Sequence, residues 1–180
     1  KSTFFRALHY HLWKTTEAKI AGMYLEESGP ETLERFCGLV LGKAAHHGSD
    51  GFVTKEQKKE AAMTLTGGRL YFWDHFDDMN TDVVMKRINY FVKVLGCKYV
   101  FLDHVSTVVV SQSVKAGGER LLLDDFLTKL RHFVEGNDCT IFIIAHVNRD
   151  KENLAEDGGK ISIGSLRGSG ILGQVPDVII

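Results

Sequence analysis

Two spacings of apolar residues alternate along this 180-residue chain, and together they predict strands separated by helices. In several segments apolar side chains recur every three or four residues, as in helices with one buried face. Between them lie short continuous apolar runs flanked by glycine or polar residues, which are typical of buried strands. The predicted helices span residues 2–13, 30–40, 54–65, 81–95, 121–135 and 165–175. The predicted strands span residues 20–25, 69–73, 98–103, 140–146 and 177–180.

This order of elements predicts an α/β fold with a mainly parallel β-sheet flanked by helices. Strands that alternate with helices of ten or more residues form right-handed βαβ units. A chain of 180 residues is long enough for one domain with a sizeable core, so residues 1–180 are predicted to form a single domain. The chain starts inside a motif and stops on an apolar run, so we expect it to be truncated at both ends.

Composition narrows the functional classes only slightly. The net charge of −1 provides no overall attraction to nucleic acid, so binding to a polyanion would need a local basic patch. Cys37, Cys97 and Cys139 are far apart and form no C-x-x-C pair, which predicts reduced thiols in a cytosolic protein. The histidines show no ligand spacing with these cysteines, so no structural zinc is expected. A signal peptide or membrane-spanning apolar run is not evident.

The first candidate motif is Lys1-Ser2-Thr3, which runs into a predicted helix. It matches the end of a G-x-x-x-x-G-K-[ST] phosphate loop, whose glycines would precede this sequence. In that loop backbone N–H groups surround the phosphates, the lysine reaches the β- and γ-phosphates, and the hydroxyl binds Mg²⁺. Three residues match by chance often, so this prediction depends on the rest of a nucleotide site following in order.

Polar residues follow the ends of several predicted strands, where ligands bind in parallel sheets. They are Glu26, Glu27, Asp74, Asp103 and His146. Asp103 ends a continuous apolar strand, as a Walker B aspartate does, and would hold Mg²⁺ together with Ser2. The alternative is an aspartate that only caps the following turn. The lysine and hydroxyl of the first motif favour the metal role.

Two further residues at these strand ends could act on a nucleotide. Glu26 is a candidate general base, because phosphoanhydride hydrolysis needs a group that positions and deprotonates water. The adjacent Glu27 is expected to be a solvated turn residue, although it is the next candidate for the base. His146 could hydrogen-bond the γ-phosphate and couple the nucleotide state to the loop that follows. It could also be an ordinary polar strand end.

The loop after His146 is the candidate nucleic-acid interface. It carries Asn148, Arg149 and Lys151, with Arg167 further on. Basic residues on a glycine-containing loop suit contacts with the phosphate backbone of a single strand, independent of base sequence. Acidic residues are interleaved with them, so a solvated surface loop is nearly as good an interpretation of the composition.

Taken together, these motifs resemble the helicase domain of the phage primase-helicases, relatives of the DnaB replicative helicases with a RecA-like core. The resemblance covers essentially all 180 residues. Its segments are Lys1-Ser2-Thr3-Phe4, Tyr24-Leu25-Glu26-Glu27-Ser28, Leu102-Asp103-His104-Val105-Ser106, Ile144-Ala145-His146-Val147-Asn148 and Leu166-Arg167-Gly168-Ser169-Gly170. The resemblance implies that Glu26 is the catalytic base, Asp103 the metal-binding aspartate and His146 the γ-phosphate sensor.

The resemblance also implies an activity and an assembly. The family members use ATP or dTTP with Mg²⁺ and move 5′→3′ on single-stranded DNA that a homo-hexamer encircles. A primase fused or associated upstream, a replicative polymerase as partner and the cytoplasm of a bacterial host are further expectations. The loop after His146 is less basic here than the family pattern. The family's arginine finger and linker helix would lie outside the sequence, so we expect these 180 residues alone to hydrolyse nucleotide poorly and to lack the helix that packs one subunit of a hexamer against the next.

Two other classes remain as alternatives. A RecA- or KaiC-like ATPase would share the fold and the nucleotide site but act as a DNA-binding or scaffold assembly without unwinding. The segment from Leu166 to Gln174 favours the helicase. A small-molecule kinase would share only the phosphate loop, and it would need an arginine-rich lid and a phosphoacceptor pocket that the sequence does not show.

Overall fold

A computed structural model describes residues 2–45, 53–74, 79–110, 118–146 and 170–180 of the chain. The chain forms two compact units. The first comprises residues 1–77, 88–103 and 139–144, and the second comprises residues 78–87, 104–138 and 145–180. The chain therefore passes between the units several times.

The first unit contains a four-stranded sheet whose strands are all parallel, as predicted. Its strands are β1 (Lys19–Tyr24), β2 (Leu70–Phe72), β3 (Cys97–Asp103) and β4 (Thr140–Ile143), in the order β2-β1-β3-β4. Five of the six β1 residues are buried, as expected for a central strand. Because the strands are parallel, their carboxyl ends lie at one edge, where Tyr24 pairs with Asp103.

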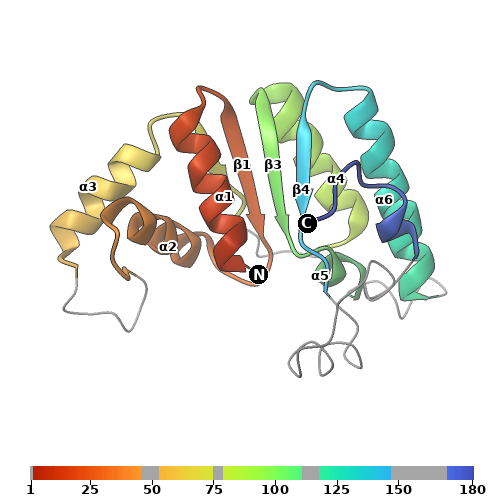
Figure 1. The fold of residues 1–180 in the computed structure, drawn as a ribbon, viewed down its shortest axis with the longest axis horizontal. Helices are drawn as coiled ribbons and strands as arrows, with labels where there is room; N and C mark the ends of the chain where they lie inside the picture. Colours follow the sequence, from red (N-terminus) through yellow and green to blue (C-terminus); the bar gives the residue numbers. More distant parts are fainter. Residues whose placement is uncertain (1, 46–52, 75–78, 111–117, 147–169) are drawn as a thin grey trace. The chain divides into compact units, whose positions relative to one another are not determined.

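Three helices of this unit begin and end close to the predicted positions. They are α1 (Ser2–Thr15), α2 (Gly29–Leu41) and α3 (Lys55–Leu65). Two of these helices start with a capping box, formed by Ser28 and Glu31 on α2 and by Thr54 and Gln57 on α3. Helix α1 lies along β1, and α3 lies beside α2 (Figure 1).

The predicted helix over residues 81–95 changes its hydrogen bonding near its end. It consists of α4 (Thr81–Asn89) followed by a π-helical turn, η1 (Tyr90–Val94). Gly96 follows with a φ of +74°, a conformation that glycine adopts without the steric cost of a Cβ atom. The glycine therefore ends the helix immediately before β3.

The remaining elements differ from the sequence prediction in several respects. A short helix, α5 (Val105–Val110), directly follows β3 and was not predicted. Helix α6 (Glu119–Glu135) begins two residues earlier than expected, and β4 ends at Ile143 rather than at residue 146. Residues 177–180 form no strand, because they pair with no other strand in the described chain. Within the predicted helix 165–175, the described part is a 3₁₀ turn, η3 (Gly170–Gly173).

The core of the first unit is built from aromatic rings around a buried histidine. His9 of α1 is fully buried, and its ring stacks on Phe101 of β3 with ring centroids 4.3 Å apart. Its Nδ1 lies 3.0 Å from the hydroxyl oxygen of Tyr24 on β1. Phe36 of α2 meets the His9 ring edge-on at 4.8 Å. The cluster thus joins α1 and α2 to the central strands.

Gly22 of β1 is a glycine that this cluster requires. A Cβ atom there would lie 2.8 Å from Tyr24 Cε2, 3.0 Å from His9 Cε1 and 3.1 Å from Phe72 Cδ1. We expect Gly22→Ala to lower the free energy of unfolding by about 1–3 kcal/mol, the usual cost of overpacking a core. Denaturant titration measures this change. Gly67→Ala is the control, because its Cβ would meet only one atom, 3.7 Å away, and an equal loss in both variants would contradict the prediction.

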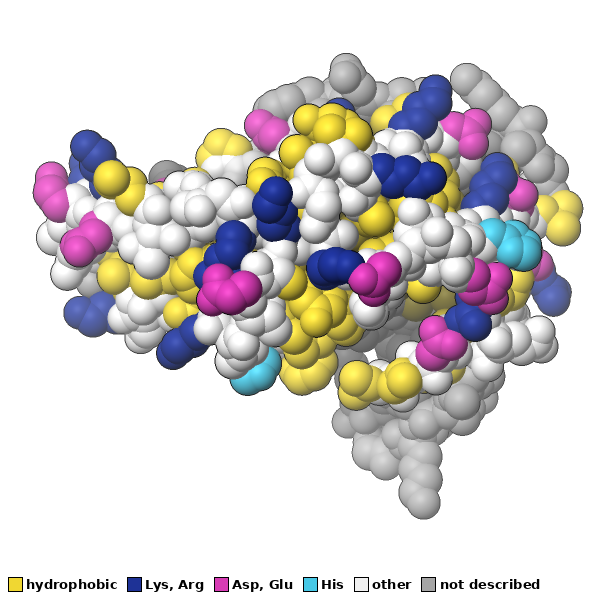
Figure 2. Space-filling view, turned by 90° about the horizontal axis from the view of Figure 1, so that it is seen from above, with side chains coloured by type: hydrophobic (Ala, Val, Ile, Leu, Met, Phe, Trp, Pro, Cys, Tyr) yellow, Lys and Arg dark blue, Asp and Glu magenta, His cyan; other side chains and the backbone are white. Residues whose placement is uncertain are grey.

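On the face displayed in Figure 2, lysine and arginine side chains are interspersed with aspartate and glutamate side chains. This mixture agrees with the net charge of −1. Within the described ranges, none of the helices has the length and apolar character needed to cross a membrane.

Candidate active site

The start of α1 and the carboxyl ends of β1 and β3 lie at the same end of the first unit (Figure 1). The Leu25 N–H donates a hydrogen bond to the Asp103 carbonyl at 2.7 Å, which holds the turn after β1 against the end of β3. Ser2, at the first position of α1, is half-buried, and Thr3 is exposed. The structure therefore gathers Ser2, Glu26 and Asp103 at one sheet edge, while Lys1 lies outside the described residues.

The two carboxylates at this edge differ in exposure. Asp103 is 7% exposed, whereas Glu26 is exposed in the turn beyond β1. A buried carboxylate and a helix-start hydroxyl are oxygen donors of the kind Mg²⁺ prefers, and Mg²⁺ keeps several waters in such sites. Among the described residues no cluster of three histidine, cysteine or acidic side chains could hold a metal by itself. The residues present thus fit a cation held jointly with a nucleotide.

Glu27 is not the solvated turn residue that we expected. Its side chain is only 17% exposed, and its Oε1 forms ion pairs with Arg6 of α1 and Arg35 of α2. The Arg35 Nε lies 3.2 Å from that oxygen. Arg6 is itself buried and lies over the Tyr24 ring, with its guanidinium carbon 5.4 Å from the ring centroid. Sequence reasoning failed here because the two arginines approach Glu27 from helices that flank it in space.

Asp74 also has a structural role at this edge. Its Oδ1 accepts a hydrogen bond from the Gly29 N–H at 2.8 Å, so a residue two positions after β2 holds the first turn of α2. A carboxylate at a helix N-terminus interacts favourably with the positive end of the helix dipole. Asp74 therefore helps to fix the start of α2, three residues after Glu26.

His146 belongs to the second unit, where its neighbour is His104. The two rings meet edge-on with centroids 4.1 Å apart. The Thr107 hydroxyl lies 3.2 Å from one ring nitrogen of His104 and 3.3 Å from the other. His146 is half-buried, and His104 is buried. The γ-phosphate role of His146 stays a prediction, as do the DNA roles of Asn148, Arg149, Lys151 and Arg167, which lie outside the described residues.

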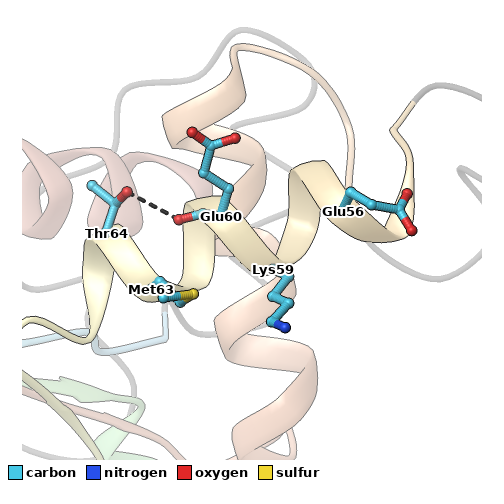
Figure 3. Close-up of a pocket in the computed structure, with 5 residues that line it drawn as sticks. All are labelled: Glu56, Lys59, Glu60, Met63 and Thr64. Atoms are coloured by element: carbon cyan, nitrogen blue, oxygen red, sulfur yellow. Dashed lines mark hydrogen bonds between the residues drawn. The ribbon is translucent and has the colours of Figure 1, made fainter.

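A separate surface hollow of about 430 Å³ lies along α3. Its lining consists of Glu56, Lys59, Glu60, Met63 and Thr64, which all come from this one helix (Figure 3). The Thr64 hydroxyl donates a hydrogen bond to the Glu60 carbonyl at 3.0 Å, a bond within the helix. A hollow lined by one exposed helix lacks converging groups from several elements, so we do not regard it as the active site.

Three residues near the candidate groups were missed from the sequence. Arg6 is adjacent to Phe5 and His9 follows Phe5 by four residues, so both lie on the inward face of α1. A charged residue such as Arg6 in that position indicates a buried partner. His104 follows Asp103 directly, at the start of a helix whose buried valines are three and four residues apart. That spacing could have revealed α5.

A scan against protein-family models found no match. The chain is similar over its whole length to the DNA helicase/primase of Enterobacteria phage T3, with 32% identity over 194 aligned positions. The predicted resemblance to the phage primase-helicases is confirmed. The chain spans 32% of the length of this phage relative.

Among solved structures, the chain resembles a KaiC-like protein of the archaeon Pyrococcus horikoshii. The TM-score is 0.47 and the sequence identity is 18%. The matched region covers 79% of this chain and 53% of the archaeal chain.

Proposed function

We propose that the chain is the motor domain of an NTP-dependent replicative DNA helicase with a RecA-like phosphate-loop core. One observation carries this proposal: the carboxyl ends of the adjacent parallel strands β1 and β3, where Glu26 and Asp103 are located, lie at the same end of the first unit as the start of α1. The similarity to a phage DNA helicase/primase along the whole chain supports it. Hydrolysis of ATP or dTTP would then drive 5′→3′ movement along single-stranded DNA.

Each candidate residue has a definite role in this proposal. Lys1, Ser2 and Thr3 bind the phosphates, and Ser2 and Asp103 hold Mg²⁺, which neutralises charge on the phosphate oxygens when bound. The exposed carboxylate of Glu26 orients the attacking water and accepts its proton. His146 senses the γ-phosphate. Asn148, Arg149, Lys151 and Arg167 contact the DNA backbone.

The proposed assembly is a homo-hexamer that encircles the single strand. A primase, fused or associated, and a replicative polymerase are the proposed protein partners in the cytoplasm of a bacterial host. Encirclement explains how a chain with a net charge of −1 could remain on DNA, because a closed ring does not depend on strong attraction to the phosphates.

The test uses the full-length protein and two measurements. We expect single-stranded DNA to stimulate hydrolysis of ATP or dTTP, and we expect unwinding of a forked duplex with a free 5′ tail. The control is the same duplex with only a 3′ tail, which a 5′→3′ motor does not unwind. Stimulated hydrolysis without unwinding of either duplex would favour a scaffold ATPase. Absence of nucleotide hydrolysis would contradict the proposal.

A further inference from the structure

The cluster formed by Arg6, Glu27 and Arg35 lies beside the proposed general base and has no role in the mechanism above. Glu27 follows Glu26 directly, and its carboxylate joins three elements: the turn after β1, the second turn of α1 and the first half of α2. We propose that Glu27 is a positioning residue that holds Glu26 in place relative to the phosphate-binding end of α1. This inference rests on the proposed function.

The first argument is the way in which the backbone around Glu26 is held. The Leu25 N–H bonds to the Asp103 carbonyl at 2.7 Å, and the Glu27 N–H bonds to the Tyr24 carbonyl at 3.2 Å. These bonds fix the turn to the strand ends. They do not connect it to α1, whose first residues would hold the phosphates. The side chain of Glu27 makes that connection through Arg6.

The second argument is the place of Arg6 on α1. Arg6 follows Ser2 by four residues, so the two lie on the same face of the helix. The ion pair between Arg6 and Glu27 therefore connects the helix that carries Ser2, which would bind phosphate and Mg²⁺, to the residue that follows Glu26. Arg35 contacts the same carboxylate oxygen from α2 and restrains the turn from the other side.

The third argument concerns energetics. The Arg6 Nε and the Glu27 Oε2 are buried and have no hydrogen-bond partner within the described part of the chain. A buried ion pair with unsatisfied atoms contributes little net stability, because desolvation of both charges offsets their attraction. The cluster is thus poorly explained as a stabilising device. Control of position is the role that its geometry fits.

The test compares single variants of the full-length protein by steady-state hydrolysis of ATP or dTTP with saturating single-stranded DNA. We expect Glu27→Gln to lower kcat by about a hundredfold, the effect of a displacement near 1 Å in a catalytic group. KM should change by less than about twofold, because the phosphate contacts remain. The matched control is Glu34→Gln, which breaks the 3.2 Å ion pair between α2 and Lys58 and should leave kcat unchanged.

A second comparison separates positioning from a loss of stability. If Glu27 acts through Glu26, then Glu27→Gln should cause no further loss in a Glu26→Gln background. If Glu27 acts independently of Glu26, the two losses should multiply, which would overturn the inference. All variants are assayed well below their unfolding midpoints. Should Glu27→Gln fail to fold, Arg35→Gln replaces it, because the Arg35 side chain is 39% exposed and its loss disturbs less of the core.

The outcomes also distinguish this inference from the proposed function. Loss of hydrolysis in Glu26→Gln with wild-type kcat in Glu27→Gln would overturn the positioning role alone. Full hydrolysis in Glu26→Gln would remove Glu26 as the base, and the positioning role would be overturned with it. Absence of hydrolysis in the wild-type protein would overturn both.

Discussion

Glu26→Gln is expected to reduce DNA-stimulated hydrolysis in the full-length protein by about a hundredfold to ten-thousandfold, the contribution typical of a general base. The amide keeps the size of the side chain and can still contact water, but it cannot accept the proton. Glu26 is exposed in a turn beyond β1, so the substitution does not alter the packing of the core. Stability and nucleotide affinity should therefore remain close to those of the wild type.

The measurement pairs the hydrolysis rate with the affinity for a fluorescent nucleotide analogue. Glu60→Gln is the control, because Glu60 is an exposed glutamate of α3 outside the candidate site. A rate that survives Glu26→Gln would assign the base to another group. A rate lost together with nucleotide binding would instead assign Glu26 to binding rather than to proton transfer.

The second large effect is a loss of stability in mild acid caused by His9. Complete burial lowers the pKa of His9 from 6.5 to about 3. The unfolded chain therefore takes up a proton as the pH falls below 6.5, while the folded chain stays neutral at this site until about pH 3. Stability should fall by about 1.4 kcal/mol per pH unit across this interval, which amounts to about 3 kcal/mol at pH 4.

His9→Phe tests this effect, because phenylalanine keeps an aromatic ring in the cluster and does not titrate. The variant should lose some stability at pH 7, since the Tyr24 hydroxyl would lose its partner 3.0 Å away. Its free energy of unfolding should then decline less steeply between pH 6.5 and pH 4 than that of the wild type. His11→Gln is the control, because His11 is exposed on the same helix. Equal slopes in the wild type and His9→Phe would contradict the prediction.

Local patterns predicted most of the elements of the first unit. Continuous apolar runs identified β1 and β3, and the helix-capping residues Ser28 and Thr54 directly precede α2 and α3 in the sequence. These signals operate within a few residues, so they can be recognised in a single sequence. One failure concerns the far end of the chain, where the apolar residues 178–180 have the composition of a strand but pair with no strand among the described residues.

The candidate site was predictable only in part, for a similar reason. Glu26 and Asp103 are strand-end carboxylates, and the parallel pairing of β1 with β3 brings those ends together. The environment of Glu27 depends instead on Arg6 and Arg35, which reach it from two helices. No local spacing encodes a contact between side chains 21 residues apart. The local indication in the sequence is Arg6, an arginine on the otherwise apolar face of α1.

The strand order β2-β1-β3-β4 has a consequence for synthesis on the ribosome. The first strand that can pair with β1 is β2, on one side, and the other side of β1 stays open until residues 97–103 have emerged. During that interval the most buried strand of the sheet presents unpaired backbone groups, which other nascent chains could join. Chaperones would thus meet this chain at one predictable length.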